Sequence, residues 1–113
     1  MADDSEATIL MYCLTGGDVD LHKLLSTIKE PIDTNFSFHV MTLAAQLGHA
    51  KCISVFVNNV GGAHLYLSYR DEYGMTVLHV ACTMGNYSSM AVLLDKIMLI
   101  VIYEPTICMH LLL

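Results

Sequence analysis

The sequence predicts an all-α repeat solenoid, in which helix–turn–helix units stack on one another and are joined by β-hairpin-like loops. Three observations lead to this prediction. An apolar pattern of helical period occurs three times, a glycine follows each occurrence, and aliphatic residues recur at a similar distance after each glycine. The chain has 113 residues, which is enough for one domain of about three such units.

The clearest unit spans residues 71–96. Thr76 is placed to cap a helix, because its hydroxyl can accept a hydrogen bond from an unpaired backbone N–H. Gly85 is expected to end that helix, because glycine tolerates the left-handed turn. The apolar residues fall on one face of each predicted helix: Leu78, Ala81 and Cys82 on the first, and Met90, Leu93 and Leu94 on the second.

Two earlier stretches repeat this pattern. Moving back 37 residues places Gly48 on Gly85 and Ala44-Ala45 on Ala81-Cys82. Moving back another 31 residues places Gly17 on the same glycine position. The predicted units are therefore residues 3–33, which are divergent and cap-like, then residues 34–70 and residues 71–96.

The third unit resembles an ankyrin repeat, whose pattern is Asp-x-x-Gly-x-Thr-Pro-Leu-His-x-Ala-Ala-x-x-Gly-His before a Val/Leu-rich helix. The matching residues are Asp71, Gly74, Thr76, Leu78, His79, Ala81, Gly85, Leu93 and Leu94. The second unit keeps Leu43 to Ala45, Gly48 and His49, and the first keeps Thr8, Leu10, Gly17, Asp18 and a Leu pair. The resemblance covers roughly residues 3–96. It implies that His79 bonds to Thr76 and to nearby backbone, which would hold the turn.

The spacing departs from the family's period of about 33 residues. By this alignment the first unit is two residues short and the second is four long. We place the extra length within residues 58–70, as an enlarged loop or a β-hairpin finger, because Gly61-Gly62 precedes the alternating Leu65-Tyr66-Leu67. Gly16-Gly17 and Gly61-Gly62 are interpreted as turns, since neither pair belongs to a phosphate-binding motif.

Residues 97–113 form an apolar tail that does not continue the pattern. A membrane span needs about 18 or more apolar residues, and this tail is interrupted by Glu104, Pro105 and His110. We therefore expect a strand or helix packed on the open end of the third unit. A foreign ending from a truncated or alternatively spliced product is the other interpretation, because repeat arrays need polar caps for solubility.

Composition excludes several classes of partner. The net charge is −6, with five Lys and Arg against eleven Asp and Glu. Without a basic patch, binding to nucleic acid or to an anionic membrane is not expected. The acidic start is unlike a secretory signal, so Cys13, Cys52, Cys82 and Cys108 are expected to be reduced and mostly buried, in the cytoplasm or the nucleus.

Two His-x-x-Cys pairs, His49 with Cys52 and His79 with Cys82, have a spacing that zinc sites use. The repeat alignment places the two pairs on different helices of their units, so structural roles are the expectation. A catalytic thiol would need exposure and a lowered pKa, whereas Cys82 is predicted to lie in the core. We expect no metal, no cofactor, no small-molecule substrate and no enzymatic activity.

The resemblance implies binding of a protein through the hairpin tips and the exposed side of the first helices. Carried over by position, this surface is Asn35, Phe36, Phe38, Gln46, Leu47, Arg70, Glu72, Tyr73, Met75, Thr83 and Met84. The hypothesis is that Phe36, Phe38 and Tyr73 are the anchors, and the alternative is that Phe36 or Phe38 is core. Of the other methionines, Met11, Met41, Met90 and Met98 are expected in the core.

The predicted function is a protein–protein interaction module, acting as an adaptor, scaffold or inhibitor. The alternative is a truncated or alternatively spliced fragment of a larger ankyrin-repeat protein, with no activity of its own. The fold does not name the partner.

Overall fold

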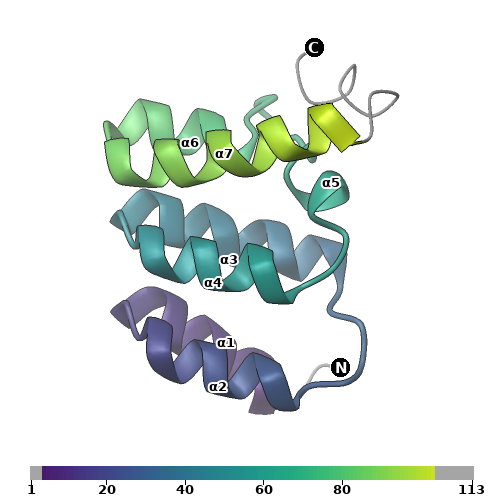
Figure 1. The fold of residues 1–113 in the computed structure, drawn as a ribbon. Coiled ribbons are helices and arrows are strands. Elements are labelled where there is room, and N and C mark those ends of the chain that lie inside the picture. The colour runs from purple at the N-terminus through teal and green to yellow at the C-terminus, as the bar shows by residue number, and fades with distance from the viewer. Residues whose placement is uncertain (1–3, 104–113) are drawn as a thin grey trace.

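A computed structural model of the protein describes residues 4–103. Within this range it contains seven helices and no strand, in three stacked layers of antiparallel helix pairs (Figure 1). The pairs are α1 (Asp4–Thr15) with α2 (Asp18–Thr27), α3 (Thr34–Leu47) with α4 (Ala50–Asn59), and α6 (Val77–Met84) with α7 (Tyr87–Tyr103). A single turn, α5 (Ala63–Tyr66), lies between the second and third pairs. The predicted all-α stack is confirmed.

A glycine in the left-handed conformation closes each pair. The φ angles of Gly16, Gly48 and Gly85 are 79°, 77° and 70°, a region that side chains rarely adopt. In each turn the next residue donates its backbone N–H to the carbonyl five residues earlier, a bond that satisfies the helix end: Gly17 to Tyr12, His49 to Ala44 and Asn86 to Ala81. The glycine of the first unit is therefore Gly16 and not Gly17, and the first offset is 32 residues.

The layers are tied together by a hydrogen bond that recurs at the residue after each glycine. His49 Nε2 lies 3.1 Å from the carbonyl oxygen of Leu14 in the first layer. Asn86, the equivalent residue of the third layer, donates from Nδ2 to the carbonyls of Ala45 at 2.6 Å and Gln46 at 3.1 Å. First helices consequently stack on first helices, and second on second.

The extra length of the second unit folds as helix and not as a hairpin. Residues predicted to alternate as a strand instead include the α5 turn, which inserts Tyr66 and Leu67 into the core. The Tyr66 ring meets Phe56 edge-on, and its hydroxyl donates to the Val60 carbonyl at 3.3 Å. Burial against an aromatic partner decides this segment, since its pattern alone fits either element.

The start of the apolar tail continues α7 and does not form a separate element. Residues 97–103 extend that helix beyond the predicted boundary at Lys96, with Ile97 and Ile100 buried. Residues 104–113 of the predicted tail lie outside the described residues. Between residues 4 and 103, no helix is both long and apolar enough to cross a membrane.

Several predicted core residues are exposed because the terminal layers each have one neighbour. Met11, Met98 and Cys82 lie on the surface, contrary to the prediction. Met41 is fully buried and Met90 packs against the core, as expected. The error arose from treating all three units as if each were covered on both sides.

Candidate protein-binding surface

The predicted binding residues divide by exposure. Most are on the surface: Asn35, Gln46, Leu47, Arg70, Glu72, Tyr73, Thr83 and Met84. Phe36 and Met75 are half-buried against the core, and Phe38 is buried. The exposed set forms two groups, one on the loop before α6 and one at the last turns of α3 and α6.

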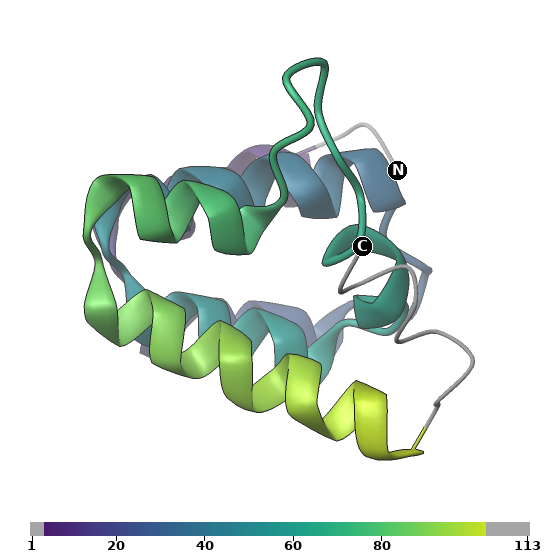
Figure 2. The same cartoon turned by 90° about the horizontal axis from the view of Figure 1, so that it is seen from above.

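The first group belongs to a finger, the loop of residues 70–76, which projects from the body of the stack (Figure 2). The Asp71 carboxylate accepts hydrogen bonds from the backbone N–H groups of Tyr73 and Met75, both at 2.9 Å. Gly74 has a φ of 76° and donates its N–H to the Asp71 carbonyl. Arg70 Nη1 donates to the Gly74 carbonyl at 3.1 Å. These bonds fix the turn locally.

Tyr73 stands at the tip of this finger with 82 % of its surface exposed. A rigid, exposed aromatic side chain binds at low entropic cost, because its backbone is ordered before the partner arrives. Of the three proposed anchors, Tyr73 alone has this exposure.

Phe38 supports the base of the finger from within the core. Its ring packs on Tyr69 with centroids 4.6 Å apart, and only 4 % of the residue is exposed. The hypothesis that Phe38 is a surface anchor is therefore wrong in this structure, and the core alternative holds for it. Tyr69, which is partly exposed at the finger base, was missed because its position depends on this packing.

The finger leads into α6 through a reciprocal cap. Thr76 Oγ1 accepts from the backbone N–H of His79 at 3.3 Å, and the Thr76 N–H donates to His79 Nδ1 at 3.2 Å. The hydroxyl also lies 2.7 Å from Nδ1. The Thr76–His79 contact that the resemblance implied is thus formed, and it sets the angle between the finger and the helix.

The second group is a row across the last turns of the first helices. Leu47 and Met84 are exposed beside Gln46 and Thr83. Leu14 lies at the matching end of α1 and is also exposed. Sequence reasoning missed Leu14, although the first unit offered it as the counterpart of Gln46. The row offers apolar contacts from three successive layers.

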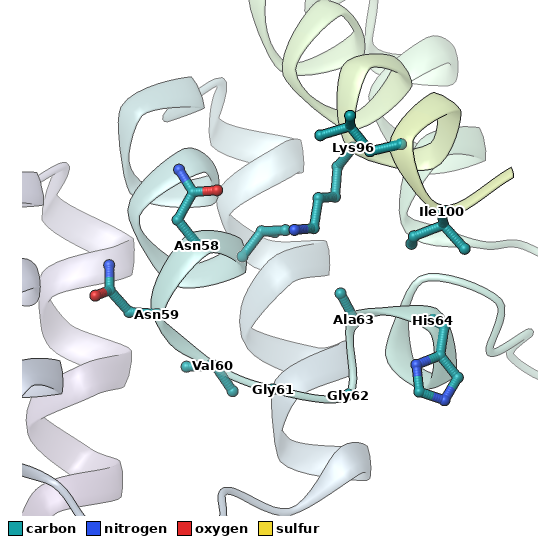
Figure 3. A pocket seen from close by; sticks show the side chains of 11 residues that line it. Asn58, Asn59, Val60, Gly61, Gly62, Ala63, His64, Lys96 and Ile100 are labelled. Carbon is teal, nitrogen blue, oxygen red and sulfur yellow. The ribbon is translucent and has the colours of Figure 1, made fainter. Parts of the chain in front are cut away.

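The enlarged second unit also creates a pocket of about 480 Å³. It lies where the end of α4 and the Gly61-Gly62 turn meet α5 and α7, and Lys96 points into it (Figure 3). His64 and Asn58 line it as well. No sequence motif indicated this pocket, because its walls come from elements separated along the chain.

The thiols differ in their surroundings. Burial raises the pKa of Cys13 to about 12, with a smaller contribution from Cys52. Burial also raises the pKa of Cys52, followed by the effect of the Asp18 carboxylate. Neither is poised as a nucleophile, since both favour the protonated thiol. Among residues 4–103 no group of three His, Cys, Asp or Glu residues could hold a metal ion.

Comparison with known proteins agrees with this architecture. The family model described as ankyrin repeats (3 copies) matches residues 10–101. The chain is 34% identical over 95 residues to the Ankyrin repeat and KH domain-containing protein mask-1 of Caenorhabditis elegans, a match that spans 79% of this chain and 3% of that relative. No solved structure gives a significant match. Since the family model spans most of its length, this chain belongs to the ankyrin-repeat family.

Proposed function

We propose that this chain binds a partner protein through the finger and the exposed row at the last turns of the first helices. Ankyrin repeats generally mediate protein–protein interaction, and stacks of this kind present extended surfaces. The observation that carries the proposal is Tyr73, which is held exposed at the tip of a hydrogen-bonded turn. Tyrosine, tryptophan and arginine dominate the energetics of protein interfaces.

The chemistry around Tyr73 suits a mixed apolar and polar partner. Arg70 and Glu72 flank the tip with opposite charges, and both are exposed. The Arg70 guanidinium gives one bond to Gly74, which leaves other donors available. Leu47 and Met84 add apolar area at the far end of the first helices. A partner that spans both groups would place an aromatic contact at one end and aliphatic contacts at the other.

The proposal is tested by capturing partners of the full chain from cell lysate, and then titrating each purified partner against variants. We expect Tyr73→Ala to weaken binding by a factor of about 30 or more, which corresponds to about 2 kcal/mol for an anchor residue. The matched control is Tyr87→Ala. Tyr87 is 79 % exposed but lies on α7, away from the finger.

The thermal midpoint of Tyr73→Ala should equal that of the unmodified chain, because the side chain packs against nothing. A partner whose affinity is unchanged by Tyr73→Ala would reject the finger as the binding site. Capture of chaperones alone, in equal amounts by both variants, would reject the interaction module itself.

The alternative, that the chain is one piece of a larger ankyrin array without activity of its own, is favoured by the apolar end of the third layer. Thermal unfolding separates the two possibilities. A single sharp transition of a well-behaved protein supports an independent module. A broad transition accompanied by binding of a hydrophobic dye supports the fragment.

A further inference from the structure

The end of the stack formed by α6 and α7 presents a continuous apolar stripe. Tyr87, Ala91, Leu94, Met98 and Ile102 follow one another at intervals of four, three, four and four residues. At about 100° per residue these positions share one side of α7, and all five are exposed. Figure 2 looks down on this layer, and Figure 1 shows no other described helix beyond it.

The same positions are covered within the stack. Leu25 of the first layer and Val57 of the second are each 5 % exposed, whereas Leu94, their equivalent in the third layer, is 45 % exposed. Likewise, Ala45 is fully buried and its equivalent Cys82 is exposed. The stripe on α7 and the adjoining side of α6 therefore have the character of a layer interface that lacks its second half.

The opposite end of the stack is different. Exposed Asp20 and Lys23 of α2 stand where the second layer has the apolar side chains of Cys52 and Val55. Stacking of one copy's first layer on another copy's third layer would bury these two charges against apolar surface, which is costly. An open head-to-tail array of copies is thus disfavoured, and a closed pairing of like ends is left.

We propose that two copies of this chain associate through their α6–α7 ends, with α7 packed antiparallel on α7 of the second copy about a two-fold axis. The stripe is complementary to itself. Tyr87 and Ile102 lie equally far from the midpoint between residues 94 and 95, and so do Ala91 and Met98. Antiparallel pairing sets the small Ala91 opposite the long Met98 of the second copy, an arrangement that packs well.

Charge does not oppose this pairing. The two charged residues of α7 that the structure describes beyond its first turn, Asp95 and Lys96, fall about 100° and 200° around the helix from Leu94. Lys96 points into the pocket beside α4 and away from the stripe (Figure 3). The stripe itself carries no charged side chain.

The size of the face sets the expected strength. A helix of 17 residues is about 25 Å long, and two packed helices are roughly 20 Å wide, so each copy contributes about 500 Å². A total of about 1,000 Å² is near the lower limit for a specific interface. We therefore expect a dissociation constant in the micromolar range.

Sedimentation equilibrium of the full chain tests the proposal over about 1 to 300 µM, the range that a small interface requires. The mass should rise from 12.5 kDa toward twice that value. Met98→Glu should remain monomeric throughout. The matched control is Met84→Glu, because Met84 is 54 % exposed and Met98 56 %, but Met84 lies off the stripe. Circular dichroism should show both variants folded.

Disulfide cross-linking fixes the register. In a Cys82→Ser, Cys108→Ser background, a mixture of Ala91→Cys and Met98→Cys chains should form a linked dimer that neither variant forms alone. A chain that is monomeric at every concentration would overturn the proposal, as would dimerisation that survives Met98→Glu. Self-linking of Met98→Cys would show a parallel pair, and a mass beyond the dimer would show an open array; either result also overturns it. Partner binding through Tyr73 is read out separately, so the two proposals can fail independently.

Discussion

The side-chain amide of Asn86 donates a hydrogen bond to the backbone carbonyl of Ala45, 2.6 Å away in the preceding layer. The same amide reaches the Gln46 carbonyl at 3.1 Å. These carbonyls belong to the last turn of α3, where helix geometry leaves them without intrahelical partners. One side chain thus satisfies the end of one helix while holding two layers in register.

Replacing Asn86 tests this contact. We expect Asn86→Ala to lower the free energy of unfolding by about 1–2 kcal/mol, because two carbonyls lose a donor. The control is Asn58→Ala, whose exposed amide reaches only Ser54 Oγ, at 3.4 Å; it should change stability by less than about 0.5 kcal/mol. Urea titration measures both. Equal effects would mean that the Asn86 bonds do not stabilise the stack.

The cap of α6 gives a second prediction. Thr76→Ala removes the hydroxyl that accepts from His79 N–H, and should cost about 1 kcal/mol. Thr83→Ala in the same helix is the control, because Thr83 is exposed and alanine favours helix. Thermal unfolding should place Thr76→Ala below the control by several degrees. A midpoint for Thr76→Ala at or above that of Thr83→Ala would contradict the capping role.

Loss of the Asp71 carboxylate should loosen the finger. In Asp71→Ala the N–H groups of Tyr73 and Met75 lose their acceptor, so their hydrogen exchange should accelerate. Glu72→Ala, at the exposed neighbouring position, should leave both rates nearly unchanged. Unaltered exchange at Tyr73 in Asp71→Ala would show that the tip is not ordered by this side chain.

Thiol reactivity should separate the cysteines. Because burial raises the pKa of Cys13 from 9.0 to about 12, its thiolate population at pH 8 should be about 1,000-fold lower than that of a free thiol. Iodoacetamide should therefore modify exposed Cys82 first, and Cys13 and Cys52 only slowly. Site-resolved mass spectrometry measures the order. Modification of Cys13 as fast as Cys82 in the folded chain would contradict its burial.

Stability should fall in alkali. Above about pH 9 the unfolded chain loses the Cys13 proton while the folded chain keeps it up to about pH 12, so unfolding becomes easier by up to about 1.4 kcal/mol per pH unit. Burial also raises the pKa of Tyr66, which adds to the loss above about pH 10. Cys13→Ala should flatten the decline between about pH 9 and 10. An unchanged slope in that variant would assign the decline to other groups.

Local features were predictable from the sequence. The cap at Thr76 and the helix-ending Gly48 and Gly85 depend on a few neighbouring residues, and the helical period of the apolar residues is itself a local signal. Gly16 was misassigned because Gly17 adjoins it, and adjacent glycines suit the same turn equally well in sequence. Only the N–H of Gly17 reaching the Tyr12 carbonyl distinguishes them.

The candidate site was predicted less completely. Tyr73 could be placed at an exposed tip because the Asp-x-x-Gly turn around it is local. Phe38 could not be assigned to core or surface, since its burial comes from Tyr69, 31 residues later. The pocket at Lys96 was invisible, because it needs α5 and α7 to meet.

By itself, the sequence determined three helical units, their turns and the cap that sets the angle of the finger. Each follows from backbone hydrogen bonding within a few residues. The tertiary structure alone decided which apolar side chains are covered. Leu25, Val57 and Leu94 share one position in the repeat, yet the first two are buried and the third is exposed. Burial depends on whether another layer lies beyond, and no single repeat contains that information.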